Sequence, residues 1–581
     1  MNNHLLVPED MNFLLKSWLK AEDLIDGDTL SAFLDLSEEV AEAQFLSHYK
    51  RSDVDEPQLG PDGVRVCADI IPALRQYAEL GFFSAGFPEE LGGLGLPFLA
   101  CSASFAWFAA ANVATAAYPM LTVANARLIA TFGNERQIDY FARPQITGDW
   151  FGTMCLSEPQ AGSSLGDIRT RAVPDGADEF GARYRIAGNK MWISGGDQNI
   201  SENIVHLVLA KVPDADGTLP EGTPGISLFI VPKVLPDGGR NDIAVAGINH
   251  KMGYRGTANC LLNFGEKGGA IGWRVGAAGQ GLRQMFQMMN EARISVGLGA
   301  AALGYRSYRL SVRYAKDRCQ GRPIGQRGGA PIPIIDHIDV RQMLLAQKAY
   351  VEGALALCLY SARLVDLEET DADATTILEL LTPVTKTWPS EHGLLANDLA
   401  IQIHGGYGYT RDFDVEQLWR DNRLNPIHEG TTGVQAIDLL GRKILRDRRG
   451  IDLLGDLIGK TAMSARQDVL LADFVDVLND DWTQICGAIS TLGNAEGSAA
   501  FDNATAFLRA FGHVVVGWLW LDQAITARRL LQSAEGNVIL CEGKVAACRF
   551  YYEFEMPKVS AWLSPVVTRS DTARVSAVDI Y

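Results

Sequence analysis

One glutamate, Glu429, stands among small and hydroxyl-bearing residues in the sequence HEGTTG, directly after an apolar helical pattern. A carboxylate that removes a proton from carbon must be held rigidly, partly desolvated, and within reach of a substrate that is backed by an electron acceptor. Gly430 and Gly433 would let the backbone approach a flat ligand, and Thr431 and Thr432 offer hydroxyl groups. This setting would suit proton abstraction, but the spacing alone favours a solvated glutamate in a turn.

Four further segments carry glycines, hydroxyls, charges or an aromatic ring in patterns of their own. They are MCLSEPQAGSSLG (154–166), KMWISG (190–195), MNEARISVG (289–297) and DRCQGRPIG (317–325). Together with the stretch 401–440 around Glu429, they resemble the acyl-CoA dehydrogenase family, flavoenzymes that oxidise an acyl-CoA thioester between its α and β carbons. Several motifs in the family's order are far harder to reach by chance than one motif alone.

The resemblance implies a reaction and the residues that perform it. The reaction needs a base, an oxyanion partner for the thioester carbonyl and an acceptor for the β-hydride. By resemblance, the Glu429 carboxylate takes the α-proton to yield the trans-2-enoyl-CoA, its backbone N–H helps to polarise the carbonyl, and N5 of FAD accepts the hydride. An apolar pocket would raise the pKa of Glu429. His428 replaces the family's common tyrosine and is expected to fill space, although its ring could tune Glu429.

The resemblance also implies how FAD is bound. Loop 154–166 offers backbone N–H groups and hydroxyls, Trp192 is expected to cover the isoalloxazine ring, and the Arg318 guanidinium is expected to pair with the pyrophosphate. The alternatives are an ordinary polar turn for the loop and a core position for the tryptophan. The expected FAD contacts are Met154, Leu156, Ser157, Gly162, Ser163, Trp192, Ile193, Ser194, Arg318, Gln320, Gln402, Gly405, Gly406 and Thr431.

The acyl-CoA substrate is expected to meet a second, overlapping group of residues. An amide and a charged group suit the polar pantetheine arm, and Asn290 stands where an aspartate is more usual. Helix capping or an intrahelical contact with Glu291 is the alternative for Asn290 and Arg293. No metal site is expected, because the nine cysteines form no CxxC pair. The expected substrate contacts are Ser163, Asn290, Arg293, Glu429 and Gly430.

The hydrophobic pattern predicts a mainly α protein with a central β domain. Spacings of three and four predict an N-terminal helical domain over 1–150, and alternation predicts a middle β-barrel or sandwich over 151–276. Helical spacing returns over 277–449, which would form a bundle that carries the catalytic glutamate, and continues over 450–581. The last part resembles the appended helical domain of long bacterial family members that act on 3-methylmercaptopropionyl-CoA or fatty acyl-CoA, so an acyl-CoA dehydrogenase-like fold is expected.

The net charge, the apolar runs and the N-terminal sequence limit which partners and which cell compartment are expected. The chain of 581 residues has a formal net charge of −18, which argues against nucleic acid because phosphate binding needs a basic face. No run of 18 apolar residues predicts a membrane span. The acidic N-terminal sequence is typical of neither a secretory signal nor a transit peptide, so a cytoplasmic location is expected.

The resemblance leaves the substrate and the electron acceptor open. The favoured interpretation is a dehydrogenase that acts on medium- or long-chain fatty acyl-CoA in β-oxidation and passes electrons to an electron-transfer flavoprotein. The alternatives are 3-methylmercaptopropionyl-CoA as substrate and an acyl-CoA oxidase as enzyme. A DNA-associated relative that keeps FAD is disfavoured by the many acids after Arg449. A homo-oligomer, with a dimer as the first expectation, is implied because the family commonly contacts the FAD pyrophosphate across a subunit interface.

Overall fold

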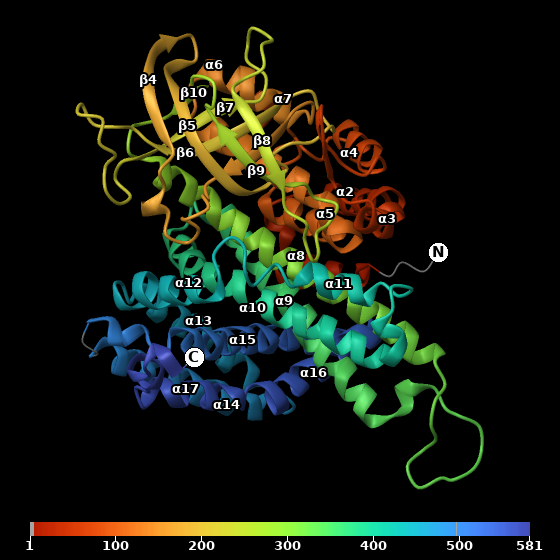
Figure 1. The fold of residues 1–581 in the computed structure, drawn as a ribbon. Coiled ribbons are helices and arrows are strands. Elements are labelled where there is room, and N and C mark those ends of the chain that lie inside the picture. The colour runs from red at the N-terminus through yellow and green to blue at the C-terminus, as the bar shows by residue number, and fades with distance from the viewer. Residues whose placement is uncertain (1–4, 495–496, 581) are drawn as a thin grey trace. The chain divides into compact units, whose positions relative to one another are not determined.

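The computed structural model describes residues 5–494 and 497–580, without the side chains of residues 286–289. The chain forms two compact units (Figure 1). Ser31–Ala292 form one unit, here called the β unit, and Met1–Leu30 with Arg293–Tyr581 form the other, here called the α unit. The two borders between them fall within helix α2 (Gly27–Val40) and within helix α8 (Gly281–Asp317). The predicted fold class, mainly helical with a central β domain, is confirmed.

A closed sheet forms the centre of the β unit. β5 pairs with β4 and β10, β10 with β7, β7 with β6, and β6 with β4, so five strands close into a barrel, and β9 and β8 extend it from β5. Strands β6 and β7 are buried along their whole length, which explains their continuous apolar sequences. The strands are β3 (Phe151–Cys155), β4 (Arg171–Asp178), β5 (Gly181–Ser194), β6 (Ile204–Lys211), β7 (Ile226–Pro232), β8 (Ile243–Ile248), β9 (Asn259–Phe264) and β10 (Ala270–Val275).

Helices of the β unit pack against this sheet. Asn125 of α5 donates through its side-chain nitrogen to the carbonyls of Thr153 and Val205, at 2.9 Å each, and so joins the helix to strands β3 and β6. One element differs from the helical prediction for residues 1–150, because β1 (Gln58–Gly60) and β2 (Gly63–Arg65) form a short antiparallel hairpin. The helices are α2 (Gly27–Val40), α3 (Tyr49–Val54), α4 (Ile70–Glu79), α5 (Phe98–Phe132), α6 (Glu135–Gln137) and α7 (Arg143–Ile146).

The α unit is built on three long helices that lie side by side, α9, α10 and α15 (Figure 1). The Trp520 indole of α15 donates to the Ala349 carbonyl of α9 at 3.1 Å. The segment after Arg449 therefore shares a core with the bundle that precedes it. The helices are α1 (Pro8–Asn12), α8, α9 (Ile338–Leu367), α10 (Ala372–His404), α11 (Val415–Asn422), α12 (Thr432–Ile437), α13 (Arg449–Ala465), α14 (Ala472–Gly493), α15 (Ala504–Ser533), α16 (Val538–Phe550), α17 (Lys558–Val567) and α18 (Thr572–Val575).

Two helices, α5 and α15, are long and apolar enough to cross a membrane by length and composition. Within the apolar window of each helix, 83% of the residues are buried inside the protein. Core helices of folded domains show the same combination of length, composition and burial.

Candidate functional site

Glu429 lies in the loop between α11 and α12, in a backbone conformation that few non-glycine residues adopt. Its φ is +52°, and that of Gly430 is +91°. The positive φ of Gly430 favours glycine at this position, and a Cβ there would also lie 2.6 Å from the side-chain nitrogen of Gln435. The same nitrogen donates to the Glu429 carbonyl at 3.1 Å. Strained residues of this kind persist only when their surroundings fix them, and they cluster at functional sites.

Thr431, an expected FAD contact, begins helix α12. Its side-chain oxygen accepts a hydrogen bond from the Val434 backbone N–H at 3.4 Å, and the residue is exposed. Thr432 lies next to it and is half-buried. A helix start directly after the loop fixes the direction in which the chain leaves Glu429.

Arg293 of α8 supplies the first of two buried cations near Glu429. It is 6% exposed and donates through Nη1 to Asp438 at 3.1 Å, so its partner is this carboxylate. Glu291, the alternative partner, pairs with Arg127 of α5. Arg293 was expected to contact the pantetheine arm. In the structure it is buried in the α unit, where its charge opposes the rise in the pKa of Glu429 that burial causes.

Lys386 of α10 supplies the second cation, and its side chain is fully buried. Its Nζ donates to the carbonyls of Asn425 and Gly430, at 2.7 Å each, on both sides of Glu429 in the sequence. Burial lowers the pKa of Lys386 to about 8, against the opposing effect of the Glu429 charge. Burial raises the pKa of Glu429 above the ordinary glutamate value, and the Arg293 and Lys386 charges limit that rise.

His428 precedes Glu429 and is half-buried. Its Nε2 lies 3.0 Å from the Asn425 side-chain oxygen. Burial, followed by the Lys386 charge, lowers the pKa of His428 to about 3. The ring is therefore neutral near pH 7 and adds no net charge beside the glutamate.

In the β unit, loop 154–166 is organised by an internal ion pair. Glu158, which is 4% exposed, accepts hydrogen bonds from the Thr170 hydroxyl at 2.6 Å and from the Arg169 backbone N–H at 2.7 Å. The fully buried Lys190 of β5 donates to Glu158 and to the Leu156 carbonyl, at 3.0 Å each. Burial opposes ionisation of Glu158, but the Lys190 charge and these hydrogen bonds outweigh it and lower its pKa to about 2.

The expected ligand contacts of this loop differ in exposure. Gly162 and Ser163 are exposed at its tip, whereas the other three are half-buried, and a Cβ at Gly162 would meet open space. The ion pair therefore fixes the base of the loop and leaves its tip accessible. The half-buried members are Met154, Leu156 and Ser157.

Trp192 lies in a β-bulge of β5, where the pairing with β9 shifts register between Lys190 and Ile193. Its φ is +65°, and 58% of the residue is exposed. Ile193 is buried in the core, so only its backbone can meet a ligand. The Ser194 hydroxyl accepts a hydrogen bond from Asn259 at 3.3 Å. The bulge turns the indole away from the core, and the alternative of a core tryptophan is wrong.

A pocket of about 440 Å³ in the α unit brings together four of the expected FAD contacts. Its aromatic wall is formed by the Tyr314 and His404 rings, which stack with centroids 4.3 Å apart, and by Tyr407 under the Arg318 guanidinium at 5.9 Å. Gln402 is exposed on the last turn of α10 and does not line the pocket. The four expected residues that line the pocket are Arg318, Gln320, Gly405 and Gly406.

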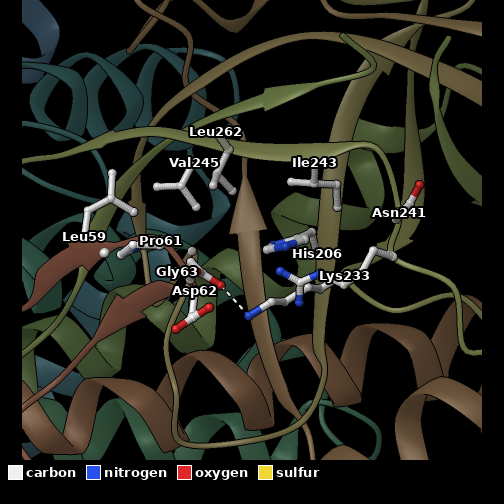
Figure 2. A pocket seen from close by; sticks show the side chains of 14 residues that line it. Leu59, Pro61, Asp62, Gly63, His206, Lys233, Asn241, Ile243, Val245 and Leu262 are labelled. Carbon is white, nitrogen blue, oxygen red and sulfur yellow. Dashed lines mark hydrogen bonds and ion pairs between the residues drawn. The ribbon is translucent and has the colours of Figure 1, made fainter. Parts of the chain in front are cut away.

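A second cavity, of about 200 Å³, lies in the β unit beneath the β1–β2 hairpin (Figure 2). Lys233 pairs there with Asp197, whose other oxygen accepts the Val64 backbone N–H at 2.8 Å. His206 also borders this cavity, and burial lowers its pKa to about 3. Asp197 therefore anchors the hairpin, and Lys233 balances its charge.

Three side chains in the α unit, His392, His513 and Glu555, lie close enough together to resemble a metal site. Hydrogen bonds account for their arrangement. His513 accepts from the Trp388 indole at 3.1 Å and lies 3.3 Å from Glu555. Glu555 also accepts from Tyr350 at 2.8 Å, and His392 Nδ1 lies 3.0 Å from the Trp388 carbonyl.

The expected substrate contacts fall into two groups. Ser163 and Asn290, which is half-buried on α8, belong to the β unit. Arg293, Glu429 and Gly430 belong to the α unit. Lys386 and Asp438 were missed, although one sequence signal was available: Lys386 is a lone cation in the helical segment LLTPVTKTWPS, and a buried cation needs a specific partner.

Models of known families match nearly the whole chain. Three describe acyl-CoA dehydrogenase domains: the N-terminal domain matches residues 32–149, the middle domain 153–266 and the C-terminal domain 279–445. A fourth, described as acetyl-CoA dehydrogenase C-terminal like, matches residues 454–574.

Individual proteins of the same kind are similar over most of their length. The chain is 34% identical to 3-methylmercaptopropionyl-CoA dehydrogenase of Ruegeria pomeroyi, over 88% of this chain and 87% of the relative. It is 32% identical to the broad-specificity linear acyl-CoA dehydrogenase FadE5 of Mycobacterium tuberculosis, over 92% of each chain. A crystal structure of an acyl-CoA dehydrogenase complexed with FAD, from Bacillus anthracis, has the same fold, with a TM-score of 0.75, 20% identity, and coverage of 98% of this chain and 93% of that one.

Proposed function

Because the chain belongs to the acyl-CoA dehydrogenase family, we propose that it oxidises an acyl-CoA thioester to the trans-2-enoyl-CoA with FAD as cofactor and Glu429 as base. One observation carries the assignment of the base. Glu429 is a half-buried carboxylate at φ +52°, with a raised pKa and two buried cations near it. Such a group is fixed in position and has gained proton affinity, as a base at carbon requires.

The residues present fit FAD. The exposed indole of Trp192 offers a flat apolar face, and Gly162 leaves the backbone of loop 154–166 accessible. Arg318 and Gln320 border a pocket with an aromatic wall, where a guanidinium suits a pyrophosphate and the rings suit an adenine. When bound, FAD supplies the acceptor for the β-hydride.

The chain's own residues have three tasks in the reaction. The Glu429 carboxylate accepts the α-proton and becomes a neutral acid, a change that its buried setting favours. The Glu429 backbone N–H donates to the thioester oxygen as negative charge develops there. Burial raises the pKa of Glu429, and the Arg293 and Lys386 charges limit that rise, which favours the ionised base before the substrate arrives.

We assign a linear, medium- or long-chain fatty acyl-CoA as the substrate. The relative with broad specificity for linear acyl-CoA supports this assignment, because it matches the appended domain as well as the catalytic bundle. 3-Methylmercaptopropionyl-CoA is the second candidate, favoured by the 34% identity to the enzyme named for it. Both acyl groups are unbranched at Cα and Cβ, so the same base can remove the α-proton from either thioester.

The remaining assignments follow from this function. We propose an electron-transfer flavoprotein as the electron acceptor for the FAD that these residues would hold, and fatty acid β-oxidation in the cytoplasm as the setting. A homodimer is supported by Arg318, which is exposed at the pocket that would hold the pyrophosphate. The net charge of −18 disfavours nucleic acid as a partner.

An anaerobic titration of the FAD-loaded protein tests the function and the substrate together. Saturated acyl-CoAs of increasing length and 3-methylmercaptopropionyl-CoA are added in turn, and the visible flavin band is followed. Bleaching by one of these thioesters is expected, and its dependence on chain length ranks the substrates. A protein that binds FAD but is bleached by none of them would contradict the proposed reaction.

A further inference from the structure

Lys386 contacts the Glu429 loop through hydrogen bonds that the proposed function does not explain. The ammonium group of Lys386 is buried inside the α unit and contacts no carboxylate within hydrogen-bond distance among the described residues. Its two hydrogen bonds go instead to the carbonyls of Asn425 and Gly430. A buried charge held only by backbone carbonyls is costly, so its position needs an explanation.

The two carbonyls bracket the catalytic residue. Asn425 lies four residues before Glu429, and Gly430 follows it directly, so one ammonium group closes the loop between them. The intervening chain contains the +52° φ of Glu429, which is unfavourable without external support. Two charge-assisted hydrogen bonds of 2.7 Å provide such support.

We propose that Lys386 is a positioning residue, which holds the Glu429 loop through the Asn425 and Gly430 carbonyls and sets the proton affinity of Glu429 through its charge. This inference rests on the proposed function of Glu429 as base. It adds a second requirement for catalysis, a fixed positive charge behind the carboxylate.

The charges around this pair are few. Glu429 interacts with Arg293 of α8 and Lys386 of α10. Lys386 interacts with Glu429, Arg293 and Glu391, the last of which is on its own helix. Arg293 is neutralised by Asp438 at 3.1 Å, so Lys386 is the less compensated of the two cations. His428 adds no charge, because its pKa is about 3.

Lys386→Met tests the proposal, since methionine keeps the length of the side chain and removes the charge. The acid limb of the kcat–pH profile reports the ionisation of Glu429. Loss of a nearby positive charge raises the pKa of a carboxylate, so the limb is expected to move to higher pH by about one unit. We expect kcat to fall about tenfold at the plateau, with a smaller change in KM, because the loop is no longer held.

Two variants separate charge from packing. Lys386→Arg keeps the charge and is expected to leave the acid limb at the wild-type pH even if kcat falls. Thr382→Val is the matched control on the same helix, because it removes the buried hydroxyl that donates to the Leu378 carbonyl at 2.7 Å, away from the loop. It is expected to lower the unfolding temperature slightly without moving the limb.

A limb that stays in place in a folded Lys386→Met variant, or moves equally in Thr382→Val, overturns the proposal. If the Lys386 variants do not fold, an infrared titration of the wild-type protein tests the proposal instead. The carboxylate infrared band that is absent from Glu429→Gln is expected to shift with a midpoint near pH 8, where Lys386 loses its proton. A band that does not respond overturns the proposal. This measurement uses no substrate, so it is distinct from a failure of the proposed reaction.

Discussion

Loop 154–166 of the β unit and the Glu429 loop of the α unit are each supported by one buried lysine. Lys190 donates to the Leu156 carbonyl and also to Glu158, which neutralises it. Lys386 donates to two carbonyls and, within the part of the chain that the structure describes, to no carboxylate. The charge of Lys190 is therefore balanced by the carboxylate of Glu158. The charge of Lys386 has no such hydrogen-bonded carboxylate among the described residues, and it acts on Glu429. Lys190 thus only stabilises its loop, whereas Lys386 stabilises its loop and also changes the pKa of Glu429.

The two loops each contain a glutamate, Glu429 or Glu158. The largest expected effect on kcat comes from replacing Glu429. Glu429→Gln keeps the shape of the side chain but cannot accept a proton, so kcat is expected to fall by roughly 10²- to 10⁴-fold. FAD and acyl-CoA binding are expected to persist. Steady-state kinetics and equilibrium binding of the same preparation measure both quantities. Retained turnover would show that another group is the base.

Glu158→Gln tests the other side of the comparison. It leaves Lys190 buried without its carboxylate, so the free energy of unfolding of the β unit is expected to fall by about 3 to 5 kcal/mol. The pKa of Glu158 is lowered to about 2 in the folded state, so its contribution is present above the ordinary glutamate pKa and is lost as the pH falls toward 2.

Denaturant unfolding of the wild type and of Glu158→Gln at pH 7 and at pH 3 measures this contribution. The difference between the two proteins is expected to shrink at the lower pH. An equal difference at both pH values would exclude an ionised Glu158 as its source.

Glu429 in its loop and Trp192 in the bulge of β5 are both non-glycine residues at positive φ, and Trp192 offers a matched pair of variants. Trp192→Gly and Trp192→Ala both remove the indole and are expected to weaken FAD binding equally. Only alanine is strained at φ +65°, so the glycine variant is expected to be more stable by about 1 kcal/mol. Thermal unfolding compares them, and equal stability would show that the bulge relaxes when the indole is removed.

The smallest effect is expected where the appended segment meets the catalytic bundle. Arg509 of α15 contacts both oxygens of Glu391 at 3.0 Å, and Glu391 lies on the helix of Lys386. Arg509→Met is expected to lower stability by at most about 1 kcal/mol and kcat by less than about threefold, with both effects weaker at high salt.

Arg466→Met is the control for Arg509→Met, because Arg466 forms a comparable exposed pair with Asp476. It is expected to leave kcat unchanged. Equal kcat values for the two variants would show that the contact between Arg509 and Glu391 does not affect the catalytic loop.

The sequence predicted the β domain and the helical regions because alternation and helical spacing are local properties. It also placed Glu429 and Trp192 at special positions through their motifs. The contacts that hold Glu429 could not be predicted in the same way. The partner of Arg293 is Asp438, 145 residues away, and Lys386 bonds to carbonyls, which every residue has. The positive φ values of Glu429 and Trp192 could not be predicted either, because a positive φ is expected from the sequence mainly at glycine and neither residue is glycine.

The α unit joins the two ends of the chain, which has a consequence for its synthesis. The Trp18 indole donates to Asp522 at 2.7 Å across 504 residues of sequence, and Asp10 pairs with the buried Lys544. At a translation rate of about 5 to 20 residues per second, Trp18 waits roughly 25 to 100 seconds for its partner to be made. The β unit is a continuous segment and can fold on the ribosome during that time, whereas the first helix must stay unpaired or be shielded by a chaperone until the last part of the chain emerges.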